Sequence, residues 1–161
     1  MPEVIKNTEE LFFVNNDNIN EVKDEAQKSS KHLARLLMHL SHEDLVQEML
    51  IAMSSGCLVM PNRAIGHSES LQLLGGELLL VIFDDFGRII QRVKMGQIGS
   101  DNPYMYRFNS TPWHTMIPLS EIVVVHEIIQ GPFKNSSEKQ PEWLPKNTDE
   151  HTDFISQCLN S

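Results

Sequence analysis

Short apolar stretches separated by turn residues recur along the middle of the chain, at a spacing of about ten residues, which is typical of all-β domains. The pattern predicts nine strands, at Leu33–Leu40, Val46–Met53, Leu58–Ala64, Ser68–Leu74, Glu77–Asp84, Arg88–Lys94, Tyr104–Phe108, Trp113–Ile117 and Ile122–Ile129. Between two of them, Asp84-Asp-Phe-Gly87 is a hairpin signal in which Gly87 suits a positive φ. Short strands with this turn chemistry favour a β-sandwich or barrel over a βαβ sheet.

The first 32 residues read as an N-terminal segment with one helix. Leu11–Val14 are apolar enough for an edge strand or for packing on the domain. Asn18 is a candidate N-cap for a helix that runs to about Ser29, and Glu21 stands three positions later, as a capping box requires. The apolar side of this helix, at Ile19, Val22 and Ala26, predicts packing against the main body.

The chain beyond the strands, residues 134–161, reads as a tail that docks on the barrel of residues 33–133. Asn147 is a candidate N-cap with Glu150 at the capping-box position, so a short C-terminal helix is expected. Its apolar side is made of Phe154, Ile155, Cys158 and Leu159. We therefore expect one domain overall.

Composition narrows the classes of function. With 161 residues and 40% hydrophobic residues, the chain can bury a core, and its apolar stretches are too short to span a bilayer. The net charge of −9 argues against a nucleic-acid surface, which needs a basic patch. Cys57 and Cys158 match no metal knuckle or disulfide framework and predict reduced thiols in a cytoplasmic protein. A small-molecule ligand or a protein partner fits this charge better.

Five residues follow the spacing of a known motif. Gly56, Asn62, Ala64, Glu69 and Gly76 match the first cupin motif, glycine-x5-His-x-His-x4-Glu-x6-glycine, in spacing. Thr111-Pro-Trp-His114 resembles the end of the second cupin motif. More narrowly, the chain resembles the WbuC-type cupin-fold metalloproteins over roughly residues 18 to 160, through the segments Ser41–Ala52, Phe83–Arg88, Trp113–Thr115 and Gly131–Phe133.

The resemblance implies an all-β cupin jelly-roll barrel, commonly a homodimer, with a divalent metal held inside by histidines and a glutamate. Members of the family often lie among surface-polysaccharide genes. This chain departs from the pattern, because Asn62 and Ala64 stand where the family has two histidines and Thr111 replaces a motif glycine. Near the last strand, Glu127-Ile-Ile129 lacks the family's lysine. Only Glu69 and His114 occupy expected ligand positions.

A partial metal site is one interpretation of these residues. Residues two apart on a strand face the same side, so His67 shares a face with Glu69 and can stand in for a missing histidine. With His114 they make a two-histidine, one-carboxylate set, suited to Zn, Ni, Mn or Fe. The expected pocket around this set is lined by Asn62, Ala64, Met60, Trp113 and Glu127. Without a metal, Glu69 and His114 can pair directly, which would raise the pKa of the histidine.

Two functions therefore stay open. In the first, a small, sugar-like molecule binds in the barrel, with or without a metal, and Glu69 and His114 act as ligands or as an acid/base pair. In the second, the barrel has lost its metal and serves as a binding or assembly module. The sequence carries no nucleophile elbow and no phosphate-binding glycine loop.

Overall fold

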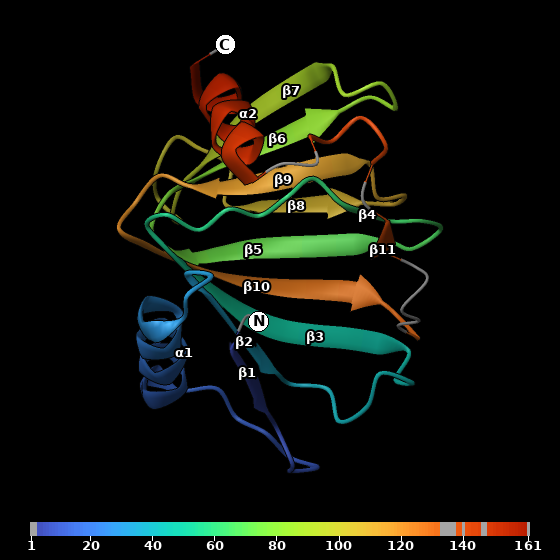
Figure 1. Ribbon diagram of the computed structural model, residues 1–161. Helices are drawn as coiled ribbons and strands as arrows, with labels where there is room; N and C mark the ends of the chain where they lie inside the picture. Colours follow the sequence, from blue (N-terminus) through green and yellow to red (C-terminus); the bar gives the residue numbers. More distant parts are fainter. Residues whose placement is uncertain (1–2, 133–137, 140, 146–147, 161) are drawn as a thin grey trace.

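The computed structural model describes residues 3–132, 138–139, 141–145 and 148–160. In chain order its elements are β1 (Glu3–Lys6), α1 (Asn16–Lys28), β2 (Leu33–Leu37), β3 (Val46–Ser54), β4 (Arg63–Ala64), β5 (Glu69–Gly75), β6 (Leu78–Phe83), β7 (Ile89–Met95), β8 (Met105–Phe108), β9 (Trp113–Pro118), β10 (Ile122–Gln130), β11 (Glu138–Lys139) and α2 (Thr148–Asn160). Strands dominate, and one helix lies at each end of the molecule (Figure 1).

Three sheets build the fold. The largest has the strand order β1-β2-β3-β10-β5-β8, a second has the order β7-β6-β9, and β4 pairs with β11. The strand register is antiparallel throughout, except that β1 lies parallel to β2. The main core joins the large sheet to the β7-β6-β9 sheet and includes Met53, Leu71, Leu80, Met116 and Val125. Among the described residues it is larger than the other two clusters of buried apolar side chains.

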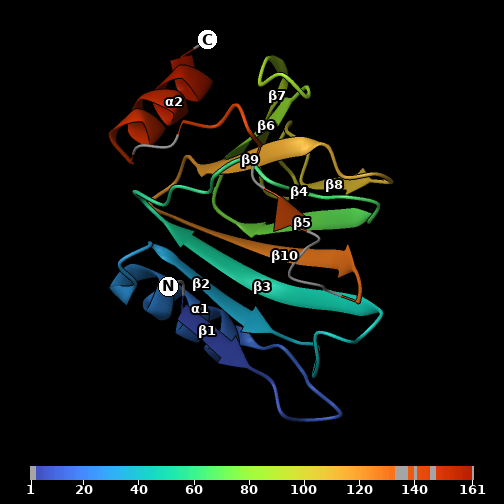
Figure 2. The ribbon, with the colours of Figure 1, turned by 45° about the vertical axis from the view of Figure 1, so that its right-hand side comes forward.

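Strand alternation gives the large sheet two working faces. On one face, Ala34 and Leu36 of β2 and Leu50 of β3 pack against Val22 and Ala26 of α1. On the other face, residues such as Ile51 and Met53 point into the barrel core. Arg35 and Leu37 of β2 lie on the same face, nearer the edge of the sheet. Figure 2 shows α1 against the β1-β2-β3 end of this sheet, far from α2. The prediction that the apolar side of the first helix packs on the body is confirmed.

The outer face of the smaller sheet carries α2. Val81, Phe83, Trp113 and Ile117 form a cluster there with Ile155 and Cys158 of the helix. Leu159, expected on the same side, remains exposed. The tip of the β6–β7 hairpin is covered by Trp143, and a Cβ on Gly87 would lie 2.7 Å from its ring. Gly87 has φ +84°, which confirms the predicted positive φ.

Several predicted boundaries are wrong. The first helix is capped by Asn15, whose side chain accepts from the backbone of Asn18, while Asn18 takes the reciprocal capping-box position predicted for Glu21. Leu11–Val14 form no edge strand, and the first strand is Glu3–Lys6. The alternative expected for this segment, packing on the domain, holds for Phe12, which contacts the cluster under α1. The predicted Leu58–Ala64 strand shortens to β4, because residues 57–61 run as irregular chain.

Other expectations fall partly outside the described residues. Asn147, the predicted cap of α2, lies outside them, while α2 itself is present at Thr148–Asn160. No helix in the described ranges is both long and apolar enough to cross a membrane.

Candidate functional site

A buried ion pair lies inside the barrel, where the two facing sheets meet. Glu69 begins β5 in the large sheet and His114 lies on β9 in the smaller one, and each is only 2% exposed. Nε2 of His114 is 3.4 Å from Oε1 of Glu69. Nδ1 of His114 is 3.0 Å from the carbonyl oxygen of Pro112. Since that oxygen can only accept, Nδ1 carries a proton and Nε2 is the nitrogen that titrates.

Tyr106 completes the pair. Its hydroxyl donates to Oε1 of Glu69 at 2.5 Å. The strand register explains this contact, because Tyr106 lies opposite Leu71 on paired β5 and β8, two residue pairs from Phe108 opposite Glu69, so Tyr106 and Glu69 are diagonal neighbours on one face. The rings of Tyr106 and Phe108 stack at 4.3 Å, and both rings lie edge-on to His114. The pair is therefore enclosed by aromatic carbon as well as hydrogen-bonded.

The pKa values favour the charged form of both partners. Burial lowers the pKa of His114, but the hydrogen bond and charge of Glu69 outweigh it, so the net pKa lies above the usual 6.5. Burial raises the pKa of Glu69, but His114 and Tyr106 lower it below the usual 4.5. Burial and the two nearby carboxylates Glu69 and Glu127 raise the pKa of Tyr106 far above 10. The environment therefore favours an imidazolium beside a carboxylate, with a neutral phenol as donor.

A small cavity of about 50 Å³ opens beside the pair. Polar groups on its wall are Glu69, His114, Glu127, Asn62 and Arg35, and the remaining lining is mostly apolar, from Leu33, Ile51, Met53, Val59, Ala64, Met116 and Ile129. A single water needs roughly 10–15 Å³ of such volume. The cavity therefore has room for a reacting group or a few waters and is too small for a whole sugar ring.

The expected pocket residues divide into two groups. Asn62, Ala64 and Glu127 line the cavity with the ion pair. Met60 and Trp113 do not, which corrects the prediction. Trp113 precedes His114 on β9 and so faces the opposite side of the sheet, where it packs with Phe83. Met60 lies in the irregular chain before β4 and packs against the same outer cluster.

His67 is not part of the site either. The chain turns at Gly66, with φ +77°, and the ring of His67 points to β10, where Nδ1 lies 2.6 Å from the carbonyl oxygen of Gln130. His67 does not line the cavity that holds Glu69 and His114. The predicted set of His67, Glu69 and His114 is therefore not assembled.

The side chains at the other motif positions do not replace the missing ligand. The amide nitrogen of Asn62 donates to the Met60 carbonyl, while the backbones of Asn62 and His114 bond each other. Ala64 offers no donor atom. Within the described ranges, no group of three His, Cys, Asp or Glu side chains is placed to hold a metal. This donor set does not fit a resident divalent ion, which takes at least three protein ligands at catalytic zinc sites.

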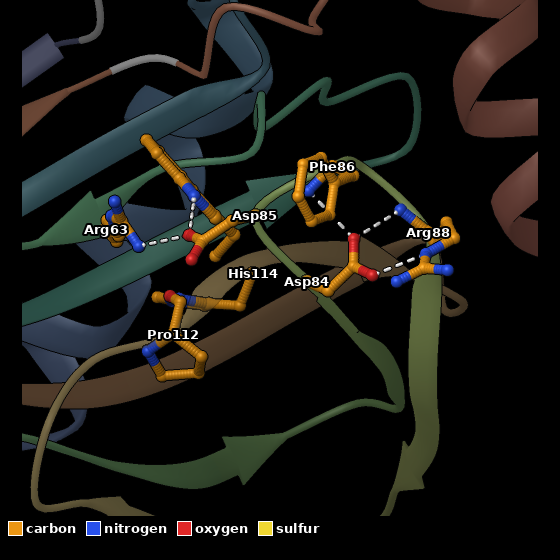
Figure 3. Close-up of polar contacts among 8 residues, drawn as sticks. Arg63, Asp84, Asp85, Phe86, Arg88, Pro112 and His114 are labelled. Atoms are coloured by element: carbon orange, nitrogen blue, oxygen red, sulfur yellow. Dashed lines mark hydrogen bonds and ion pairs between the residues drawn. The ribbon is translucent and has the colours of Figure 1, made fainter.

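A second polar cluster lies on the outer face of the smaller sheet, β7-β6-β9, on the side of β9 opposite to His114. Nη1 of Arg63 is 2.7 Å from Oδ1 of Asp85, which also accepts from the indole nitrogen of Trp113 at 3.1 Å (Figure 3). The guanidinium of Arg63 lies 4.2 Å from the centre of the Trp113 ring. Asp84, beside it, bonds Arg88 and the backbone of Phe86 in the hairpin turn. This cluster holds the hairpin in place and has no contact with the cavity.

Two site residues were missed by reasoning from the sequence, namely Tyr106 and Arg35. The signal for Tyr106 is its place in a predicted strand, but the register between that strand and Glu69 is needed to bring them together. The signal for Arg35 is a charge within an otherwise apolar strand, Leu33 to Leu37. An isolated charge at such a position marks a face that contacts solvent or a ligand.

Comparisons with known proteins agree with this architecture. Residues 14–95 match a family described as a domain of unknown function, DUF6016. No curated protein sequence matches the chain. Among solved structures, an oxalate oxidase in complex with the substrate analogue glycolate superposes with a TM-score of 0.53 at 11% identity, over 83% of this chain and 68% of the other.

Two bacterial structures are similar to a comparable degree. A protein of Shewanella oneidensis has a TM-score of 0.55 at 10% identity, with 66% of this chain and 72% of that one covered. A cupin 2 conserved barrel domain protein from Rhodopseudomonas palustris has a TM-score of 0.51 at 10% identity, with 77% and 73% covered. The chain thus has the cupin jelly-roll fold, and the predicted fold class is confirmed. At these identities the likeness carries no information on activity.

Proposed function

The chain belongs to the DUF6016 family, and we propose that its barrel cavity takes the carbonyl end of a small, sugar-like compound and transfers protons on it. The observation that supports this proposal is the buried, charged pair of Glu69 and His114 beside a small cavity. Strongly perturbed titratable groups at a cavity are typical of acid/base sites. A buried ion pair stabilises a fold only slightly, because the cost of removing both charges from water offsets much of their attraction. Stability alone is therefore a poor explanation for this pair.

The roles follow from the geometry. Nε2–H of His114 is the acid, since Nδ1 is held by the Pro112 carbonyl and the raised pKa favours protonation of Nε2. It donates its proton to the carbonyl oxygen of the ligand. Glu127, which lines the same cavity, is the base that takes a proton from the adjacent carbon. The C–H electron pair forms the C=C bond of an enediol while the carbonyl π electrons take the proton of His114. Glu127 then returns its proton to the former carbonyl carbon and His114 takes the hydroxyl proton of the neighbouring carbon, which becomes the new carbonyl.

The other two groups set up the acid. Glu69 stabilises the imidazolium, and the hydroxyl of Tyr106 holds the Glu69 carboxylate toward His114. Both are positioning residues, because they act through His114. The apolar remainder of the cavity lowers the local dielectric and so strengthens these interactions.

Deuterium exchange tests the proposal. A panel of aldose and ketose phosphates, free sugars and uronic acids is incubated in D₂O with the protein, and loss of C–H signals is followed by ¹H NMR. We expect exchange at the carbon next to the carbonyl group of at least one compound, reduced at least 100-fold in both His114→Gln and Glu127→Gln. No exchange across the panel, or exchange unchanged in these variants, would contradict the proposal.

The resemblance to WbuC-type proteins supplies the sugar-like ligand and a link to surface polysaccharides as part of this proposal. A metal-dependent version of the site is its rival. After purification without chelators or an affinity metal column, we expect less than a tenth of a divalent ion per chain and no uptake of added Ni, Zn, Mn or Fe. About one ion per chain, lost in Glu69→Ala, would favour the metal-dependent version instead.

A further inference from the structure

A second, larger cavity adjoins the barrel site. It measures about 370 Å³ and lies on the large sheet, over β1, β2, β3 and β10. Its lining comprises Val4, Lys6, Arg35, Leu37, His39, His42, Gln47, Met49, Glu127 and Ile129. Three of these residues, Arg35, Glu127 and Ile129, also line the cavity of the ion pair, so the two cavities share a wall. A volume of this size is in the range of small-molecule sites.

Strand register explains why the two cavities adjoin. Lys6 pairs with Leu37, Leu37 with Met49, and Met49 with Glu127. The same row continues across β5 to Tyr106, whose hydroxyl reaches Glu69. Residues opposite one another in a sheet share a face, so one straight row runs from Lys6 at the sheet edge to the acid/base site. The face that lines the barrel thus continues outside it.

The lining of this larger cavity carries a net positive charge. Lys6 and Arg35 contribute two full positive charges, and Glu127 is the only carboxylate of the lining. Neither Lys6 nor Arg35 belongs to an ion pair in the part of the chain that the structure describes. Arg35 is half-buried between the two cavities, where an unpaired guanidinium gains from an anionic partner. This arrangement contrasts with the net charge of −9 of the whole chain.

The side walls of the cavity are rigid and polar. Nδ1 of His39 is 3.1 Å from the backbone nitrogen of Glu48, which fixes the ring against β3. The ring of His42 lies 5.9 Å from it, centre to centre. The amide of Gln47 bonds the backbone carbonyls of Ser41 and Asp44, so it holds the loop that carries His42. The site is therefore preorganised before any ligand enters.

We propose that this outer cavity binds the acidic group of a small molecule, a carboxylate or a phosphate, through Arg35 and Lys6. Arg35 forms the bidentate contact that a planar guanidinium makes with either group, and Lys6 adds a second charge from β1. The inference deepens the proposed function, since it gives the ligand of the barrel site a charged end. The uncharged, carbonyl-bearing end then faces Glu127 and His114.

Calorimetric titration tests this assignment with four probes, namely glucuronate, glucose 1-phosphate, inorganic phosphate and glucose. We expect at least one of the two acidic sugars to bind at least tenfold more tightly than glucose, with affinity falling as salt is added. The preferred acidic sugar shows whether the group is a carboxylate or a phosphate. Equal binding of glucose and both acidic sugars, or affinity independent of salt, would overturn the proposal, as would inorganic phosphate binding more tightly than either acidic sugar.

Variants locate the binding group. Arg35→Met should lower the affinity for the acidic probe at least tenfold, and Arg35→Lys should lower this affinity less. Lys94→Met is the matched control, because Lys94 is also a strand lysine but lies in the smaller sheet, paired with Glu77. Its affinity should equal that of the unmodified protein. Unchanged binding by Arg35→Met, with an unchanged melting temperature, would overturn the assignment.

The two proposals fail separately. His114→Gln should lose deuterium exchange and still bind the acidic probe, with a smaller loss of affinity than Arg35→Met, since His114 does not line the outer cavity that holds the acidic group. If the acidic probe binds through Arg35 but no compound exchanges deuterium, only the proposed proton transfer is overturned. If exchange occurs and Arg35→Met retains full affinity, only the anion site is overturned.

Discussion

Two ion pairs lie on opposite faces of β9. One contains His114, and the other contacts the neighbouring residue, Trp113. On the inner face, His114 meets Glu69 with both side chains almost fully buried. On the outer face, Trp113 meets Asp85, which pairs with Arg63 while remaining 69% exposed. Water screens the outer pair, so this pair contributes little to the free energy of folding. In the inner pair, Glu69 has lost its contact with water and is bonded instead to His114 and to the Tyr106 hydroxyl. Similar contacts thus form a nearly fully buried pair beside a cavity on one face and a largely exposed pair on the other.

Removing one partner of the inner pair should have the largest effect. Glu69→Leu leaves a buried imidazole and the Tyr106 hydroxyl without their acceptor, so we expect a loss of about 3–5 kcal/mol in the free energy of unfolding by urea at pH 7. The double variant Glu69→Leu with His114→Met, which replaces the pair by apolar side chains, should recover part of this loss. A single variant that loses less than about 1 kcal/mol would show that the inner pair behaves like a surface pair.

A smaller effect is expected from pH. Glu69 has a lowered pKa, so its contribution is present above pH 4.5 and is lost as the pH falls through its folded pKa. His114 has a raised pKa, so its contribution is full below pH 6.5 and is lost as the pH rises through its folded pKa. The stability difference between the unmodified protein and Glu69→Gln should therefore be largest from about pH 4.5 to 6.5. A difference that keeps growing up to pH 9 would refute the charged pair.

The smallest effect should come from the outer pair. Asp85→Asn keeps an oxygen for the indole nitrogen of Trp113 and removes only an exposed charge next to Arg63. We expect a change within about 1 kcal/mol in the free energy of unfolding, and no change in the deuterium-exchange rate. Thermal denaturation and the exchange assay measure both. A change comparable to that of Glu69→Leu would remove the distinction between the two faces of β9.

Much of the fold follows from local signals. The strands around Val46–Ser54, Leu78–Phe83 and Ile122–Gln130 are apolar and bounded by turn residues, so their positions can be read from the chain to within a residue or two. The first strand, Glu3–Lys6, carries no such signal, since it is short, exposed and mixed in character. It forms because β2 offers a free edge in the folded sheet, a condition set by the rest of the molecule.

The site divides in the same way. The motif spacing brought out Glu69 and His114, and the structure places them together. His67 was predicted as a ligand from strand alternation with Glu69, but the chain turns at Gly66 and His67 contacts Gln130 instead. Trp113 was predicted to line the pocket, but it faces the opposite side of β9 from His114. Homodimer formation stays a prediction.

By itself, the sequence determined the all-β class and the helix faces, which depend on periodicity and turn chemistry acting over a few residues. The two ionisable residues of the buried pair came from the resemblance of the chain to the cupin motifs. Only the tertiary structure decided that Tyr106 reaches Glu69, that Ala64 and Asn62 leave the ligand set incomplete, and that Lys6, Arg35 and Glu127 share one face. The physical reason is strand register, which aligns residues up to about 120 positions apart and is set by the packing of the whole core.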